Sequence, residues 1–143
     1  MPYEYLDGIA VADVAFRASG KTLEEVFEAA VDATTGAMVE NLSDVGAAVR
    51  KRVRLSDSSL DLLLYQLLQE IVFYKDAERL LLRAGSLSFG EKGGAHVLDA
   101  LLVGERIDEE KHRLIVDVKA VTLHRLSLRE TGAGWEATVV LDV

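Results

Sequence analysis

The sequence predicts a single α+β domain in which two helices pack on an antiparallel or mixed β-sheet. Two segments carry apolar residues at helical spacing, and several others alternate apolar and polar residues as strands do. The strands that follow the second helix have no further helices between them, which argues against a parallel βαβ arrangement. The chain has 143 residues, a usual length for one domain, so we expect one domain over residues 1–143.

Capping residues and apolar periodicity predict the two helices. Thr22 and Glu25 have the Thr-x-x-Glu spacing of a capping box, and the apolar stripe behind them predicts a helix over about residues 23–39. A second candidate cap at residues 58–61 precedes a leucine-rich stripe that predicts a helix over about residues 60–74. This stripe is too short and too polar to span a bilayer, so no membrane contact is expected.

Strands are predicted on both sides of these helices, because side chains alternate between the two faces of a strand. Turn residues rich in glycine separate the later strands into hairpins. We expect strands at residues 3–6, 11–18, 47–55, 79–89, 95–105, 115–129 and 135–142, with turns at 90–94 and 131–134 and a charged loop at 106–113.

The composition and charge exclude several classes of function. The net charge is −8, and the first 44 residues hold nine acidic residues against two basic ones. Such a chain is a poor general binder of nucleic acid and favours metal cations or a basic protein partner. The absence of cysteine excludes disulfides, thiolate zinc sites and cysteine nucleophiles, and it is typical of a cytoplasmic protein.

Catalytic motifs are missing from the sequence. No serine lies in a glycine-flanked elbow, and the glycines at 90–94 lie between strands instead of opening a helix. The three histidines have no metal-ligand spacing. We interpret His96 and His112 as solvated surface residues and His124 as a partly buried strand residue.

Two aspartates stand out because each interrupts or ends an apolar strand. Asp13 lies in Val-Ala-Asp-Val-Ala-Phe, and Asp142 follows Thr-Val-Val-Leu and precedes Val143. If the two strand ends converge, Asp13, Asp142 and the terminal carboxylate of Val143 form an all-oxygen cluster suited to calcium, magnesium or manganese. The alternative is two unrelated surface aspartates at strand ends.

A basic segment, Arg50-Lys-Arg-Val-Arg54, contrasts with the acidic chain. Its simplest interpretation is the solvated face of an edge strand that is protected from aggregation by charge. The alternative is a contact for RNA or for an acidic partner. The segment has no interleaved aromatic residue for base stacking, which argues against a single-stranded RNA surface.

Several short motifs lie along the whole chain in a characteristic order, and together they resemble the archease family. They are Tyr3-Glu-Tyr-Leu-Asp7, Ala12-Asp13-Val14, Gly20-Lys-Thr-Leu-Glu-Glu25, Phe27-Glu-Ala-Ala30, Leu63-Leu-Tyr65, Asp76-Ala-Glu78, Gly104-Glu105, Lys111-His112, Val118-Lys-Ala-Val-Thr122 with His124, Gly134-Trp135 and Val139-Val-Leu-Asp-Val143.

The resemblance implies a non-enzymatic partner of the GTP-dependent ligase that joins RNA ends in tRNA splicing. Such a protein promotes guanylylation of the ligase and its multiple turnover. The resemblance also implies a divalent metal site, with calcium favoured and magnesium or manganese as alternatives. By position its ligands are Asp13, Asp142 and Val143, and Lys119, His124 and His112 are secondary candidates for partner contact or support of the site.

The chain departs from the family pattern around the first aspartate. The family has an aspartate followed by His-Thr directly before its Ala-Asp-Val-Gly motif, whereas here the longer segment Gly8–Ala12 separates Asp7 from Asp13. Ala15 replaces the motif glycine, and Leu123 replaces a tyrosine. These changes leave open a second hypothesis, a metal-binding or chaperone-like interaction module unrelated to RNA ligation. A third, an independent hydrolase, rests only on the carboxylates.

Overall fold

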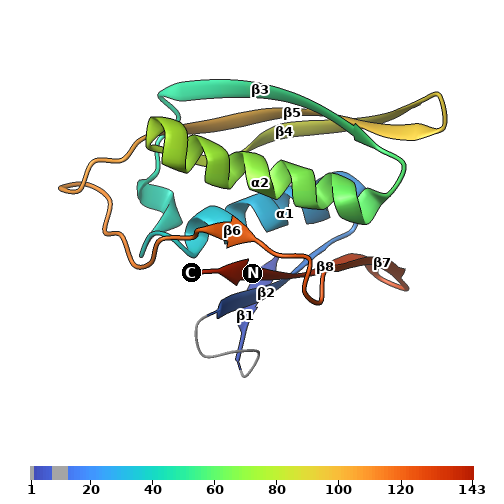
Figure 1. The fold of residues 1–143 in the computed structure, drawn as a ribbon, viewed down its shortest axis with the longest axis horizontal. Coiled ribbons are helices and arrows are strands. Elements are labelled where there is room, and N and C mark those ends of the chain that lie inside the picture. The colour runs from blue at the N-terminus through green and yellow to red at the C-terminus, as the bar shows by residue number, and fades with distance from the viewer. Residues whose placement is uncertain (1, 8–12) are drawn as a thin grey trace.

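Two antiparallel sheets enclose two helices in a computed structural model that describes residues 2–7 and 13–143 (Figure 1). The helices are α1 (Leu23–Gly36) and α2 (Leu60–Glu78), with a short 3-10 helix, η1 (Leu42–Asp44). The strands are β1 (Tyr3–Leu6), β2 (Asp13–Gly20), β3 (Val49–Asp57), β4 (Leu80–Lys92), β5 (Ala95–Arg106), β6 (Ala120–Val121), β7 (Ser127–Thr131) and β8 (Gly134–Asp142). The predicted α+β class with two helices is confirmed.

The first sheet joins the two ends of the chain. Its strand order is β1-β2-β8-β6, and β7 also pairs with β8. Every pairing in it is antiparallel, and β8 is the strand that links β2 to the late strands β6 and β7. The second sheet has the order β3-β5-β4, again antiparallel. The pairing of β2 with β8 thus places the strand of Asp13 beside the strand of Asp142.

The core lies between the sheets, where the helices bury their apolar stripes. The capping box is present: Thr22 accepts from the amide of Glu25, whose carboxylate accepts from the amide of Thr22. The largest fully buried side chains come from both helices and both sheets. They include Phe16, Phe27, Leu63, Leu64, Leu67, Leu68, Ile71, Leu82, Leu98 and Leu102.

The predicted strand at 115–129 is the main error of the sequence interpretation. The structure has only the short strands β6 and β7 there, and residues 115–119 belong to no strand, although the Ile115 and Lys119 amides donate to the Met38 and Asp142 carbonyls. Side chains of α2 also hydrogen-bond to the main chain of this region. Lys75 Nζ donates to the Val118 carbonyl at 2.7 Å, and Gln69 accepts from the Val121 amide at 2.9 Å.

Helix ends differ from prediction by a few residues. α1 ends at Gly36, and the main chain then turns into η1. α2 continues to Glu78, because Arg79 at its C-cap takes a left-handed conformation (φ 53°) that stops the helix there. Among the described residues, neither helix is long and apolar enough to cross a membrane.

Candidate functional site

Asp13 and Asp142 lie directly opposite each other on neighbouring strands. The β2–β8 register pairs Asp13 with Asp142 and Val14 with Leu141. Directly opposed residues of an antiparallel pair have Cβ atoms about 4.5–5.5 Å apart and point to the same face. The structure therefore brings together the two aspartates that the sequence singled out, and their carboxylates can reach one common point.

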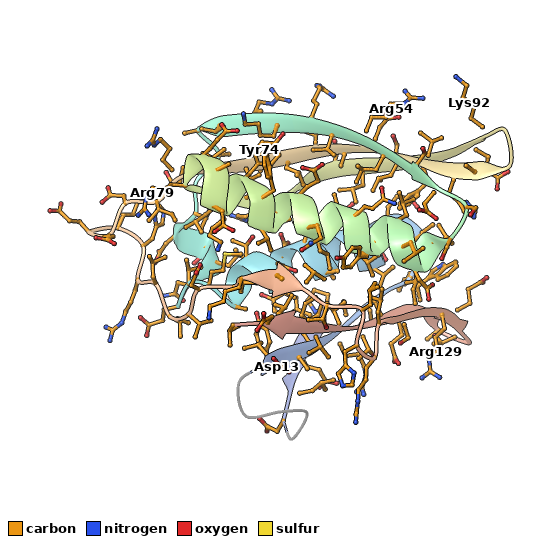
Figure 2. All side chains as sticks on the ribbon, in the orientation of Figure 1. Asp13, Arg54, Tyr74, Arg79, Lys92 and Arg129 are labelled. Carbon is orange, nitrogen blue, oxygen red and sulfur yellow. The ribbon has the colours of Figure 1, made fainter. Side chains whose placement is uncertain are left out.

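The aspartates face away from the core. Phe16, Val14 and Leu141 pack inward, so the alternate residues of both strands, including the two aspartates, lie on the outer face of the sheet. The next pair on that face, Ala15 and Val140, is buried. Asp13 is half-buried and Asp142 is exposed. Figure 2 shows Asp13 and Arg129 at opposite ends of this sheet.

Neither aspartate side chain forms a hydrogen bond or ion pair with another described residue. Arg17 lies on the same face of β2 but already has acidic partners, because it pairs with Glu4 at 2.9 Å and approaches Glu136 to 3.7 Å. Like charges directly opposed across two strands repel each other. A cation between the two carboxylates would relieve that repulsion, so the residues present fit a divalent ion.

The donor set is at the lower limit for calcium. Two carboxylates and the main-chain oxygens of Val143 offer about six oxygens at most, against the roughly six to eight that calcium takes. Within residues 2–7 and 13–143 no third histidine, cysteine, aspartate or glutamate joins the pair as a ready ligand. Water or a partner protein would have to supply the remaining oxygens.

The main chain around Asp142 is fixed by the third strand of the site. β6 pairs Ala120 with Asp142, and the Lys119 amide donates to the Asp142 carbonyl at 2.8 Å. The Lys119 side chain is exposed. Of the secondary candidates, Lys119 is therefore the one that the structure holds next to the aspartate pair.

His124 and His112 do not have the environments that the sequence predicted. His124 was expected in a strand and partly buried, but it is exposed in a turn after β6. Two consecutive turn residues, His124 and Arg125 (φ 56°), break the strand pattern there. His112 was expected to be solvated, yet only 2 % of its surface is exposed.

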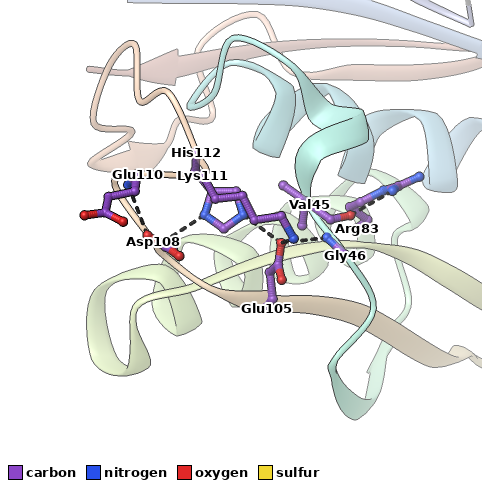
Figure 3. Close-up of polar contacts among 8 residues, drawn as sticks. All are labelled: Val45, Gly46, Arg83, Glu105, Asp108, Glu110, Lys111 and His112. Atoms are coloured by element: carbon purple, nitrogen blue, oxygen red, sulfur yellow. Dashed lines mark hydrogen bonds and ion pairs between the residues drawn. The ribbon is translucent and has the colours of Figure 1, made fainter.

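His112 is part of a closed polar network at the end of β5 (Figure 3). Its Nε2 lies 2.8 Å from Glu105 Oε1, and its Nδ1 accepts from the Asp108 amide at 2.9 Å. Because Nδ1 accepts, the ring proton is on Nε2, and the neutral imidazole donates to Glu105. Lys111 Nζ and the Gly46 amide also contact Glu105 Oε1, at 2.7 and 2.8 Å.

These contacts stabilise the charged form of Glu105. The hydrogen bond from Gly46, with those from Lys111 and His112, lowers the pKa of Glu105 from 4.5 to about 2. The network ties the loop after β5 to the connection between η1 and β3. Next to Glu105 in β5, Gly104 allows β4 to pack closely, because a Cβ there would collide with the Leu81 carbonyl oxygen. His112 is thus a structural residue here and is not accessible to a partner.

The sequence interpretation did not recognise this network. The signal was present in the pairs Gly104-Glu105 and Lys111-His112. A tight loop between them brings the two pairs together, and periodicity carries no information about such a loop.

A hollow of about 600 Å³ lies elsewhere on the described surface. It is formed near Gly20 and Trp135, the opposite end of the β2–β8 ladder from Asp13 and Asp142, and its lining includes Glu25, Glu28 and Asp32. At the aspartate end of the ladder, Asp142 is exposed and can therefore contact another macromolecule.

Solved structures place this fold in a known class of protein. The solution structure of Methanobacterium thermoautotrophicum protein 1598 matches with a TM-score of 0.85 and 34% identity, over 99% of each chain. The crystal structure of a Thermotoga maritima archease, described as a possible chaperone, matches with a TM-score of 0.60. Its 15% identity over 94% of this chain and 93% of that one shows likeness of fold alone.

The sequence comparisons give the family. The model of the archease protein family (MTH1598/TM1083) matches residues 3–143. The archease of Methanosarcina mazei is 32% identical over 99% of this chain and 95% of its own. The archease of Methanothermobacter thermautotrophicus is 35% identical over 99% and 98%, respectively. The chain belongs to the archease family, as its motifs indicated.

Proposed function

We propose that this protein is an accessory factor that activates a GTP-dependent RNA-splicing ligase and is not an enzyme itself. The observation that carries the proposal is the register of β2 and β8, which opposes Asp13 and Asp142 on an exposed sheet face in a member of the archease family. The activated step is guanylylation of the ligase, and the consequence is multiple turnover in tRNA splicing or RNA repair.

The metal is the proposed link between this surface and the ligase. Asp13, Asp142 and the main-chain oxygens of Val143 would hold a divalent ion, with calcium favoured over magnesium or manganese. A bound divalent ion supplies positive charge that stabilises phosphate oxygens. In this proposal the aspartates hold the ion at the surface, exposed Lys119 contacts the partner beside it, and exposed His124 is a further candidate contact.

The acidic charge of the chain fits this indirect role. A protein of net charge −8 is repelled by RNA at long range, and it is attracted to a basic protein surface such as one that binds RNA. The proposed protein therefore acts on RNA through the ligase and needs no RNA contact of its own.

The direct test is ligation of broken tRNA halves by the cognate ligase, with substrate in large excess over enzyme. Addition of this protein should convert a single turnover into many. Asp13→Ala and Asp142→Ala should fail to do so, whereas Asp44→Asn, which removes an exposed carboxylate in η1, should behave as wild type. Unchanged turnover with the wild-type protein would reject the proposal.

A chaperone-like interaction module is the second candidate, because the archease of Thermotoga maritima carries the description of a possible chaperone. This candidate predicts that the protein prevents aggregation of the ligase without changing guanylylation of the soluble ligase. Light scattering of the heated ligase and radiolabelled GMP transfer separate the two functions. The Gly8–Ala12 segment, where the family pattern changes, lies outside the described residues.

A further inference from the structure

The two edges of the second sheet differ in whether their main-chain groups are hydrogen-bonded. At the β4 edge, side chains of α1 satisfy the main chain: Asp32 accepts from the Ala84 amide at 3.0 Å, and Thr35 donates to the Leu82 carbonyl. At the other edge, β3 pairs with β5 alone among the described strands. Every second residue of β3 therefore directs its N–H and C=O groups away from the sheet.

A row of arginines lies along this open edge. Arg50, Arg52 and Arg54 are all exposed and point to the outer face, about 6.6 Å apart along the strand. Arg54 approaches Asp99 to 3.6 Å, while Arg50 and Arg52 lie opposite the apolar residues Val103 and Leu101. Figure 2 shows Arg54 projecting from β3 on the side away from α2.

A groove lined by both apolar and polar side chains lies on the inner side of the same edge. A hollow of about 520 Å³ lies between β3 and α2, lined by Leu55, Tyr65, Gln66, Gln69, Glu70 and Phe73. Phe73 is 56 % exposed, although it is one of only four phenylalanines in the chain. A strand added to the β3 edge would place alternate side chains over this groove and the others beside the arginines.

We propose that the β3 edge binds an extended peptide segment of a partner in which acidic and apolar residues alternate. The segment adds to the sheet as a further strand, so its main chain pairs with β3. Its acidic side chains meet Arg50, Arg52 and Arg54, and its apolar side chains enter the groove against Leu55 and Phe73. This surface is on the second sheet and is separate from the aspartate pair on the first.

Two other occupants fit less well. A second copy of the chain paired through β3 would oppose arginine to arginine, which is unfavourable. RNA would find no aromatic side chain on the arginine face of the sheet for stacking. An acidic peptide uses the arginines, the open main chain and the groove together.

The test uses a fluorescently labelled octapeptide of four Glu-Ile repeats, with capped ends, and measures anisotropy against the full-length protein. Two control peptides are four Lys-Ile repeats and the same composition in two blocks, four glutamates followed by four isoleucines. The alternating acidic peptide should bind about tenfold or more tighter than either control. Equal binding of all three peptides would overturn the proposal.

Variants then test the two faces of the edge separately. Arg50→Glu with Arg52→Glu should weaken the peptide about tenfold, and Phe73→Ala should weaken it several-fold. The matched control is Arg113→Glu with Arg129→Glu, which makes the same change of net charge at side chains that are 82 % and 69 % exposed. All these residues are exposed, so circular dichroism should show the same fold and melting temperature within a few degrees.

Strand addition has a signature that side-chain contact alone lacks. Hydrogen exchange followed by NMR should show the outward amides of β3 slowed about tenfold or more by the peptide, because they become hydrogen-bonded. Unchanged exchange with tight binding would overturn the strand model. A labelled RNA duplex that binds through Arg50 and Arg52, with no binding of the peptide, would overturn the choice of partner.

Discussion

Glu105 and the Asp13–Asp142 pair are carboxylate sites with opposite surroundings. Glu105 is contacted by Lys111, His112 and the Gly46 amide within 2.8 Å, and its side chain is only 17 % exposed. The two aspartates oppose each other at an exposed strand end and have no cationic partner among the described residues. The charge of Glu105 is balanced by groups within the fold. The charges of the two aspartates would have to be balanced by an ion or a partner from outside the chain.

The difference separates stability from function. A satisfied, buried carboxylate contributes to folding, and its loss leaves its partners without hydrogen bonds. An opposed, unsatisfied pair of carboxylates costs folding energy, and a bound cation would offset that cost. Variants at the two sites should therefore have opposite effects on binding and on stability.

The largest effect is expected in metal binding. Asp142→Asn removes one of two carboxylates, and calcium affinity measured by calorimetry should fall about a hundredfold or more, because affinity depends on the charged ligands. Glu105→Gln should bind calcium as wild type does. Equal affinity of Asp142→Asn and wild type, or no heat with wild-type protein, would remove the metal from this site.

The next effect is a loss of stability at the satisfied site. Glu105→Ala leaves His112 Nε2, the Gly46 amide and Lys111 without their acceptor, and it should lower the free energy of unfolding by about 2–3 kcal/mol. Urea denaturation followed by circular dichroism measures it. Asp13→Asn is the matched control, and a loss of the same size there would contradict the contrast.

The pH dependence of folding should follow Glu105. Its pKa is lowered in the folded state from 4.5 to about 2, so the unfolded chain binds a proton more readily. The stability from this group is present above about pH 4.5 and is lost as the pH falls toward 2. Acid unfolding of wild type and Glu105→Gln should therefore differ in this window, with the wild type losing more stability. The same loss of stability with falling pH in both proteins would contradict the low pKa of Glu105.

The smallest effect should be a gain of stability without metal. Asp13→Asn removes the repulsion between the opposed aspartates, and it should raise the free energy of unfolding by a few tenths of a kcal/mol in chelator-treated samples. Added calcium should make the wild type more stable than Asp13→Asn, because only the wild type gains free energy from binding the ion. A destabilised variant in the absence of metal would show that Asp13 has a structural partner.

The sequence predicted the helices, strands β1, β2 and β8 of the first sheet, the three strands of the second sheet and the two aspartates, because each has a local signal. The capping box at Thr22 and Glu25 and the alternation in residues 135–142 are short-range patterns. Asp13 and Asp142 stood out because a carboxylate in an apolar strand is costly. Whether the two aspartates lie opposite each other depends on the pairing of two strands that are far apart in the sequence. The sequence could therefore predict the cluster only on the condition that the two strand ends converge.

The errors fall where tertiary contacts replace local pattern. Three of the five residues 115–119 are apolar and β-branched, yet Lys75 on α2 holds this segment through the Val118 carbonyl and Asp117. Burial alone would lower the pKa of Lys75, but hydrogen bonds to Asp117 and Asp76 raise it, so the ammonium stays charged. His112 was assigned to solvent because its loop is charged, although its ring is buried and hydrogen-bonds to the Glu105 carboxylate and the Asp108 main-chain amide. Neither contact has a spacing that a sequence pattern reveals.

The central position of β8 also sets the order of assembly. β2 near the start of the chain pairs with β1 and with β8, so it lacks one neighbour until residue 142 has left the ribosome. Pairings between such distant segments form late, since closing a long loop costs chain entropy. Asp13 therefore meets Asp142 only after synthesis has passed residue 142. A partner that recognises the pair would engage the folded protein and ignore shorter nascent chains.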